Sequence, residues 1–309
     1  MAKEQVFYHI PVLLKEVVEL LVTDENGIYV DGTIGGGGHS EKILERLGEG
    51  GRIFGFDKDI EAIEFCKERF KGELERGERS RIELFNECFS KACSITRHRG
   101  EWTGFLLDLG VSSRQLDESR RGFSYRAVGP LDLRFSPHGQ TAEDLVNAAN
   151  EEVLAALLQR YGEEPFAKKI AKAIVQQRKI SPLRTTVDLA KVVENVVPKK
   201  YLVKSLSRVF QAIRIAINDE LNVLENALFA SLGCLSKGGR IVVISYHSLE
   251  DRIVKNFFRK FSLSKVNETS KIMPRLKVLT KKPIVPSKEE IALNPRSRSA
   301  KLRAAEKIS

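Results

Sequence analysis

Two hydrophobic patterns alternate along the first third of the chain. Apolar residues at positions 13, 14, 17, 18 and 21 share one helix face, which predicts an amphipathic helix over residues 9–21. Short apolar runs then predict four strands, with charged helical segments after the first two. These strands are expected to end at Asp31, Asp57, Asn86 and Gly110. Such β–α alternation predicts a doubly wound, parallel α/β sheet.

A glycine-rich turn joins the first strand to the first predicted crossover helix. Residues 35–38 are four consecutive glycines, placed after Asp31 and before the helical segment 41–47. A turn without Cβ atoms at the start of a helix allows the backbone to approach a nucleotide-like ligand closely. Glycine runs also form ordinary loops, so the turn alone is a weak indication.

Asp57, at the end of the second strand, strengthens this indication. An acidic side chain at this place in a βαβ unit reaches the ribose hydroxyls of a bound adenosine. It could instead cap the following helix, which starts near Asp59. The glycine turn upstream favours nucleoside binding.

The residues around the turn distinguish between nucleotide ligands. A P-loop requires Lys followed by Ser or Thr, whereas this turn ends in His39 and Ser40. Asp31 would repel the pyrophosphate of a nicotinamide dinucleotide, although a NAD-linked oxidoreductase remains an alternative. An acid suits S-adenosyl-L-methionine, which carries an ammonium and a sulfonium group and no phosphate. The pattern therefore favours a methyltransferase.

Three further residues stand at or after the ends of later strands. Phe89 follows the third strand, where it could stack on an adenine ring or pack in the core. Asp108 ends the fourth strand, where a carboxylate would point at the reacting centre. His247 follows a buried strand at residues 240–245, and a structural role is as consistent with this position as a catalytic one.

The middle of the chain interrupts the β–α alternation. Residues 114–140 form a long polar loop in which arginines adjoin aromatic residues, a composition that suits single-stranded RNA or a solvated loop. Helical patterns without strands follow this loop. We therefore expect a discontinuous sheet domain, residues 1–112 and 205–309, and an inserted loop and helical domain at 113–204 that helps to recognise the substrate.

The last third of the chain is expected to return to the sheet. The helical period continues from Phe210 to Leu232 and predicts one long helix before the strand at residues 240–245. Residues 294–303 are expected to form a basic tail that binds phosphate or is solvated.

Composition indicates the kind of partner and the cellular compartment. The 309 residues carry a net charge of +10, which is consistent with a nucleic-acid partner. The four cysteines, Cys66, Cys88, Cys93 and Cys234, lack the spacing of a zinc site, so we expect reduced thiols and no metal. There is no apolar signal segment and no run long enough to span a bilayer, so a cytoplasmic protein without a membrane partner is expected.

The chain resembles the bacterial 16S rRNA (cytosine-N4)-methyltransferase family over nearly its whole length. The matching stretches occur in order at residues 9–13, 31–33, 37–40, 107–113, 115–116, 121–124, 129–134, 161–164, 210–214, 248–252 and 294–296. Two positions depart from the family pattern. Arg114 stands where a proline is expected before Gln115, and Tyr246 stands where a phenylalanine is expected before His247.

The resemblance implies a Rossmann-like class I methyltransferase sheet and S-adenosyl-L-methionine as methyl donor. The implied donor-binding residues are Gly37, Gly38, His39, Asp57, Phe89, Asp108 and Gln115. The implied target is one cytidine in the decoding region of 16S rRNA, in the small ribosomal subunit. A homodimer is one assembly state that the sequence leaves open.

The group that takes the proton from the cytosine amino group is not fixed by a motif. Many amino-methyltransferases have a Pro-Pro-aromatic segment after the fourth strand, and this chain has none. Our hypothesis is Asp108 or His247, with Asp132 as a further candidate. The competing class of function is a nucleoside-binding RNA module without catalysis.

Overall fold

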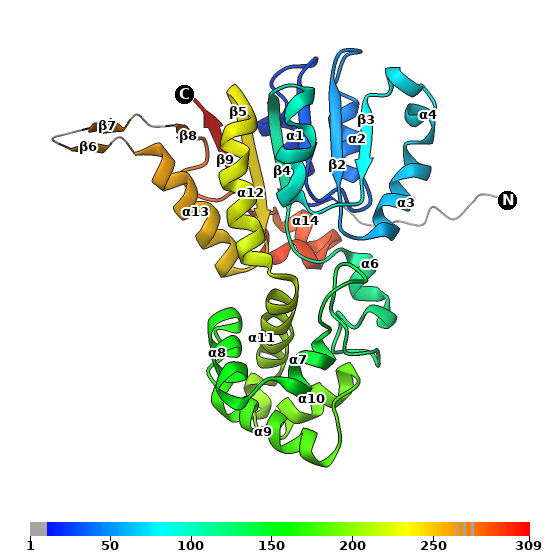
Figure 1. The fold of residues 1–309 in the computed structure, drawn as a ribbon, viewed down its shortest axis with the longest axis vertical. Helices are drawn as coiled ribbons and strands as arrows, with labels where there is room; N and C mark the ends of the chain where they lie inside the picture. Colours follow the sequence, from blue (N-terminus) through cyan, green and yellow to red (C-terminus); the bar gives the residue numbers. More distant parts are fainter. Residues whose placement is uncertain (1–10, 264, 268–269, 273–274) are drawn as a thin grey trace. The chain divides into compact units, whose positions relative to one another are not determined.

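A computed structural model describes residues 11–263, 265–267, 270–272 and 275–309. The chain forms two compact units (Figure 1). One unit consists of the chain before Val111 together with Leu221–Ser309, and the other is Val111–Glu220. We refer to them as the sheet unit and the helical unit.

The sheet unit is built on one seven-stranded sheet in the order β3-β2-β1-β4-β5-β9-β8. Its strands are β1 (Ile28–Asp31), β2 (Arg52–Phe56), β3 (Ile82–Phe85), β4 (Trp102–Asp108), β5 (Leu235–Ser245), β8 (Leu276–Val278) and β9 (Lys301–Lys307). The first five strands in this order are parallel, and β9 runs antiparallel to both β5 and β8. The prediction of a doubly wound sheet is confirmed. A separate antiparallel ribbon pairs β6 (Lys265–Asn267) with β7 (Ser270–Ile272).

Helices cover both faces of this sheet because alternate strand residues point to opposite sides. Tyr29 and Leu106 pack on one face with α1 (Leu14–Leu21), α2 (Gly38–Leu44) and α3 (Ile60–Arg69). Val30 and Phe105 pack on the other face with α5 (Ala92–Thr96), α12 (Glu220–Cys234) and α13 (Ser248–Ser262) (Figure 1). The shorter elements are α4 (Lys71–Leu74), α14 (Lys288–Leu293), η1 (Gly77–Arg79), η2 (Phe89–Lys91), η3 (Arg97–Arg99) and η5 (Pro295–Ser299).

The helical unit has its own hydrophobic core. It contains α6 (Ser113–Asp117), η4 (Ser119–Arg121), α7 (Ala142–Ala148), α8 (Glu151–Gly162), α9 (Ala167–Ile180), α10 (Thr186–Glu194) and α11 (Lys199–Asn218). Thr141, Asn150 and Thr185 cap α7, α8 and α10 with their side chains, as expected for helix starts of these residue types. Among the described residues of the whole chain, no helix combines the length and hydrophobicity needed to cross a membrane.

Two predicted helices are corrected by the structure. The long helix from Phe210 to Leu232 is two helices, because Asp219 takes a left-handed backbone (φ 51°) that ends α11 before α12 begins. The first helix begins at Leu14 rather than at residue 9. Leu13 has φ 53°, and its N–H donates to Glu290 Oε1 (2.8 Å) instead of entering a helix. Residues 9 and 10 lie outside the described part of the chain.

The predicted basic tail, residues 294–303, is not a free terminus, because η5 covers part of it and its last three residues begin β9 inside the sheet. Arg296 and Arg298 are exposed, and phosphate binding by them stays a prediction. β9 lies between β5 and β8, and Leu302 and Ala304 are fully buried. Arg303 is buried as well, and its Nε donates to Asp251 Oδ1 (2.6 Å). This cation is therefore used inside the sheet unit and is not available to phosphate or solvent.

The expectation of four reduced thiols is wrong for one pair. Cys93, in α5, forms a disulfide with Cys234, the last residue of α12. Cys66 and Cys88 are free, and Cys66 is buried. Burial raises the pKa of the Cys66 thiol, so it stays protonated.

Candidate active site

The carboxyl ends of three neighbouring strands bring three acidic residues to one edge of the sheet. Asp31 ends β1, Asp108 ends β4, and Asp57 directly follows β2. The strands are parallel and hydrogen-bonded in the order β2-β1-β4, so their ends lie together. Ligands of open α/β sheets bind at this edge, which makes it the candidate active site.

The glycine turn is attached to this edge by hydrogen bonds. The N–H of Gly35 donates to Asp57 Oδ2 (3.0 Å), and the N–H of Asp59 donates to Asp57 Oδ1 (2.9 Å). Burial raises the pKa of Asp57 to about 6, although these two hydrogen bonds act to lower it. Asp57 is therefore mostly ionised at pH 7. Each carboxylate oxygen can accept a second hydrogen bond, so contact with ribose hydroxyls remains open to it.

Packing explains why Gly37 and Gly38 lack a Cβ, and contact of their backbone with a ligand stays a prediction. A Cβ on Gly37 would lie 2.7 Å from the ring of Phe70, and a Cβ on Gly38 would lie 2.5 Å from Pro11. The missing Cβ atoms of these two residues make room for protein side chains rather than for a ligand. Gly35 and Gly37 both have a left-handed backbone (φ 49° and 75°) that favours glycine, and the nearest atom to the Cβ position of Gly35 is 3.8 Å away.

Asp31 is buried within this edge and organises the turn. Only 2% of it is exposed. The Ser40 hydroxyl donates to its Oδ2 (2.7 Å), and the N–H of Thr33 donates to its Oδ1 (3.2 Å). Burial is the largest influence on this carboxyl and raises its pKa. Asp31 thus connects the end of β1 to the first turn of α2.

His39 and Asp108 face each other across the candidate site. His39 Nε2 lies 3.0 Å from the carbonyl oxygen of Val12, and a carbonyl can only accept, so Nε2 carries the proton. Burial lowers the pKa of His39, which keeps the ring neutral and leaves a lone pair on Nδ1. This atom lies 3.8 Å from Asp108 Oδ2. Two acceptor atoms at this separation suit an N–H donor placed between them.

Two side chains hold Asp108 from its other sides. Its N–H donates to Thr33 Oγ1 (2.7 Å), and the hydroxyl of Tyr246 donates to its Oδ1 (2.9 Å). Burial raises the pKa of Tyr246 well above its ordinary value, so the phenol remains a donor. The departure from the expected phenylalanine therefore adds a hydrogen bond at the site. Thr33 and Tyr246 were not among the predicted site residues. The tyrosine at position 246, where the family pattern has phenylalanine, was the sequence feature that could have indicated a role for Tyr246.

Phe89 lies at the same edge of the sheet. It begins η2 after β3, and a Cβ on Gly32 would be 2.8 Å from its own Cβ, so it packs against the residue that follows β1. It is partly buried against the core on this face of the sheet. Both interpretations from the sequence fit this position.

His247, the second predicted proton acceptor, caps a helix. It precedes α13, and its Nδ1 accepts from the N–H of Glu250 (3.4 Å) while Glu250 Oε2 accepts from the N–H of His247 (3.3 Å). Because Nδ1 is the acceptor in this cap, Nε2 is the ring nitrogen that carries a proton. That atom lies 3.2 Å from Glu250 Oε1 without hydrogen-bond alignment. This geometry favours the structural role.

The remaining two predicted site residues belong to the helical unit. Gln115 closes a capping box at the start of α6, where its Oε1 accepts from the N–H of Ser112 (3.0 Å). Asp132 accepts two hydrogen bonds from the guanidinium of Arg134 (2.8 Å each). Burial acts to raise the pKa of Asp132, but the hydrogen bonds from Arg134 outweigh it and hold the pKa below its usual value. Such a carboxylate is a weak proton acceptor.

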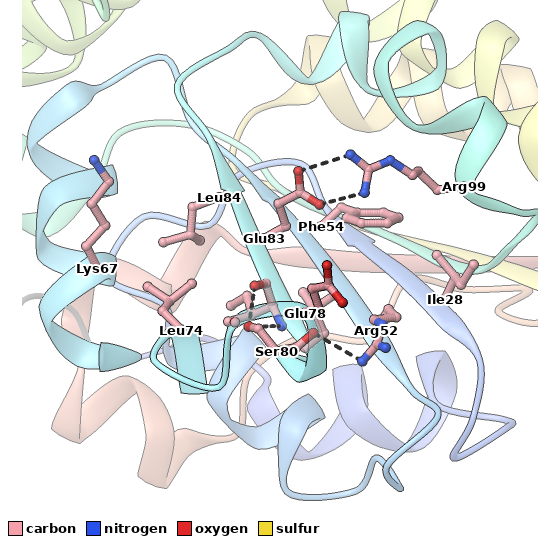
Figure 2. A pocket seen from close by; sticks show the side chains of 13 residues that line it. Ile28, Arg52, Phe54, Lys67, Leu74, Glu78, Ser80, Glu83, Leu84 and Arg99 are labelled. Atoms are coloured by element: carbon pink, nitrogen blue, oxygen red, sulfur yellow. Dashed lines mark hydrogen bonds and ion pairs between the residues drawn. The ribbon is translucent and has the colours of Figure 1, made fainter. Parts of the chain in front are cut away.

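A cavity of 610 Å³ lies elsewhere in the sheet unit, beside the edge strand β3 (Figure 2). Its lining includes Ile28, Arg52 and Phe54 from the first halves of β1 and β2, together with the ion pair between Glu83 and Arg99. None of the strand-end acids lines it. The size of this cavity therefore does not identify it as the reaction site.

The fold and the site together define a class of protein. A sheet in this order, a glycine turn into the first crossover helix and acids at three adjacent strand ends are the features of Rossmann-like enzymes that bind a nucleoside-containing ligand. A sequence model described as the MraW methylase family matches residues 6–308. The chain belongs to this family and is a class I methyltransferase. The NAD-linked alternative is set aside.

Curated relatives agree with this assignment. A protein named ribosomal RNA small subunit methyltransferase H from Geotalea uraniireducens is 47% identical over 314 residues, covering 98% of this chain and 99% of the relative. Proteins of the same name from Heliobacterium mobile (44% over 317 residues, 98% and 99% covered) and Caldicellulosiruptor saccharolyticus (47% over 314 residues, 98% and 100% covered) are similar to it. The family resemblance is confirmed.

Proposed function

We propose that this protein transfers a methyl group from S-adenosyl-L-methionine to N4 of one cytidine in the decoding region of 16S rRNA. The observation that carries the proposal is the row of acidic residues across the ends of β2, β1 and β4, in which Asp57 and Asp108 are partly exposed and Asp31 is buried and organises the turn. This row suits a ligand that has a ribose and positive charge and lacks phosphate. The names of the curated relatives support small-subunit rRNA as the substrate.

The residues of the sheet unit fit the parts of such a donor. Asp57 would accept from the ribose hydroxyls, and Phe89, at the same edge, would stack on the adenine. His39 Nδ1 and Asp108 Oδ2, 3.8 Å apart, offer two acceptors to the methionine ammonium. The family resemblance adds Gln115 at the methionine end. When bound, the donor supplies an electrophilic methyl group on its sulfonium.

Asp108 is the best candidate for the acceptor of the amino proton. The cytosine N4 is a poor nucleophile because its lone pair is delocalised into the ring, so an acceptor on its N–H increases its reactivity. Tyr246 fixes the orientation of the Asp108 carboxylate, and Thr33 holds its backbone N–H. Asp132 is engaged by Arg134, and His247 is engaged in the cap of α13. These contacts make both residues weaker candidates.

Positioning is expected to supply much of the rate. The amino nitrogen must approach the methyl group in line with the bond to sulfur, and a fixed approach replaces a bimolecular encounter. The cytosine must leave its stack for its edge to reach the strand ends. The carboxylate of Asp108 would hold the amino N–H in the reactive direction and receive the proton, while the N–C bond forms, the C–S bond of the donor breaks and S-adenosyl-L-homocysteine leaves.

Methyl transfer to small ribosomal subunits tests the proposal. The experiment uses labelled S-adenosyl-L-methionine and subunits that lack the modification, followed by nucleoside analysis. One labelled N4-methylcytidine in the decoding region is expected. Label on another base or on ribose would overturn the target, and donor binding without transfer to any subunit preparation would favour a non-catalytic RNA-binding module.

A further inference from the structure

Two helices of the helical unit begin with charges that helix physics disfavours. The starts of α9 and α11 are preceded by Phe166 and Pro198, neither of which makes a capping hydrogen bond with its side chain. The first turns of these helices carry Lys168 and Lys169, and Lys199 and Lys200, with no acidic residue. The amino end of a helix has partial positive charge, so lysines there are unfavourable.

The other long helices of this unit follow the opposite rule. α7, α8 and α10 each start with a side-chain cap and at least one acidic residue in the first turn. By contrast, α9 and α11 carry five lysines or arginines each and contain no Asp or Glu. Lysines in place of acidic and capping residues at two helix starts of one small domain indicate a functional surface.

The two helix starts lie next to each other. The rings of Phe166 and Tyr201, from the starts of α9 and α11, have centroids 5.9 Å apart. Glu164 connects the same segments, because its Oε1 accepts from the hydroxyl of Ser205 (3.0 Å) and its Oε2 lies 3.9 Å from Arg208 Nη1. The side chain of Glu164 is buried, and its Oε1 also accepts from the N–H of Phe166 (3.0 Å), so its charge serves the start of α9; Glu163, before it in sequence, is exposed.

The lysines at this junction are exposed and have no ionic partner among the described residues. Five of them stand within three residues of Phe166 or Tyr201: Lys168, Lys169, Lys199, Lys200 and Lys204. The ring of Tyr201 is 44% exposed and has the Lys200 ammonium 4.7 Å from its centroid. We call Tyr201 and these five lysines the lysine–tyrosine surface.

We propose that the lysine–tyrosine surface binds a single-stranded segment of the substrate RNA. Phosphates would neutralise the lysines and the positive end of α11, which turns an unfavourable arrangement into a favourable one on binding. Tyr201 offers a flat, exposed ring on which one base stacks. This inference rests on the proposed function and adds to it a surface that is separate from the strand-end acids.

The test compares variants of equal charge. Lys200→Gln/Lys204→Gln removes two charges from the surface. Lys179→Gln/Lys191→Gln removes two exposed charges from elsewhere in the same unit; Lys179 is near the far end of α9, about 15 Å from Lys169 along its axis. Tyr201→Ala removes the ring, and Tyr201→Phe keeps it. Binding to a fluorescent single-stranded RNA of about 12 nucleotides is measured over a range of KCl concentrations.

The expected results are specific. Lys200→Gln/Lys204→Gln should bind about tenfold more weakly near physiological salt, and the slope of log K against log salt should fall by about 1.4, since each phosphate contact on a single strand contributes about 0.7. The control pair should keep the wild-type slope. Tyr201→Ala should weaken binding at least fivefold, and Tyr201→Phe should not. The melting temperature of Lys200→Gln/Lys204→Gln should be unchanged or higher, because one unfavourable helix-start charge, Lys200, is relieved.

Several outcomes overturn the inference. Wild-type salt slope and affinity in the lysine variant would do so, as would equal effects of Tyr201→Ala and Tyr201→Phe. If the variants bound whole small subunits more weakly but bound naked RNA as well as wild type does, the partner of this surface would be a ribosomal protein and not RNA. Failure of the wild-type enzyme to methylate any subunit would refute the proposed function, whereas normal methylation together with unchanged RNA binding in the variants would refute this surface alone.

Discussion

The hydroxyl of Tyr246 donates to Asp108 Oδ1 at 2.9 Å and thereby links the residue after β5 to the last residue of β4. The two strands are already neighbours in the sheet. The phenol adds a fixed orientation to a carboxylate whose other oxygen faces His39. Hydrogen bonds to a charged acceptor are stronger than neutral ones, so this contact restricts Asp108 more than packing alone would.

Tyr246→Phe removes this hydrogen bond with little change of shape. We expect donor affinity to change little and the single-turnover rate of methyl transfer to fall by about tenfold, since a hydrogen bond to a charged group contributes roughly 1.5–3 kcal/mol. Rapid-quench kinetics and calorimetric donor binding measure the two effects. An unchanged rate would mean that Tyr246 only packs beside Gly110, where the structure also places its ring.

Asp108→Asn tests the assignment of the proton acceptor. The amide cannot take the amino proton, so the single-turnover rate should fall by about 10²- to 10⁴-fold. His247→Asn and Asp132→Asn are the matched controls. Asparagine is a good helix cap, so α13 should stay intact in the first, and both controls should transfer methyl at close to the wild-type rate. A larger loss in either control than in Asp108→Asn would move the role to that residue.

Asp57 is expected to make donor binding depend on pH near 6. The ribose hydroxyls need an ionised acceptor, and burial raises the pKa of Asp57 to about 6. Donor affinity should therefore weaken below pH 6 with the uptake of one proton. Asp57→Asn should bind the donor weakly at every pH and lose this step. A wild-type titration that is flat between pH 5 and 7 would contradict the contact with ribose.

The same carboxyl should also influence stability in the donor-free protein. Its pKa is higher in the folded chain than the value of 3.8 expected when unfolded. The folded state therefore binds the proton more tightly, and this stabilisation is present at low pH and lost as the pH rises through 6. The difference between the pKa values corresponds to about 3 kcal/mol. Urea unfolding at pH 4 and pH 7 measures this effect. The difference in the free energy of unfolding between wild type and Asp57→Asn should change between the two pH values.

Gly37→Ala tests whether the glycine turn serves packing or the ligand. Its φ of 75° costs an alanine about 1–2 kcal/mol, and the new Cβ would meet the ring of Phe70. The free energy of unfolding should fall by at least that amount. Part of the loss should disappear in a Phe70→Leu background, where the clash is relieved. Normal stability with lost donor binding would instead assign the glycine to the ligand.

The sequence was sufficient for the first five strands because their patterns are local. Each is a short apolar run with an acid, an asparagine or a polar cluster at or after its end. Their order in the sheet was not predicted, and the proximity of Asp31, Asp57 and Asp108 follows from that order.

The errors arose where distant parts of the chain decide the structure. β9 contains Arg303 and two lysines, and it is a strand because β5 and β8 pair with it on both sides. Cys93 meets Cys234 across 141 residues. At the site, Phe70 and Pro11 occupy the positions that a Cβ on Gly37 and a Cβ on Gly38 would need. No local sequence pattern indicates these contacts. The sequence shows that Tyr246 departs from the family pattern. Its hydrogen bond to Asp108 could not be predicted, because it depends on the register between β4 and β5.

The register of β4 and β5 also has a consequence for how the chain folds. These adjacent parallel strands are separated in sequence by the entire helical unit, Val111–Glu220. Closing so long a connection costs entropy while it is a random coil, and the cost falls once it has collapsed into a domain with its own core. The helical unit should therefore fold before β4 and β5 pair in the sheet. Asp108 would acquire its partner Tyr246 in one of the last steps, so catalytic competence should appear later than most of the helical structure in a refolding experiment.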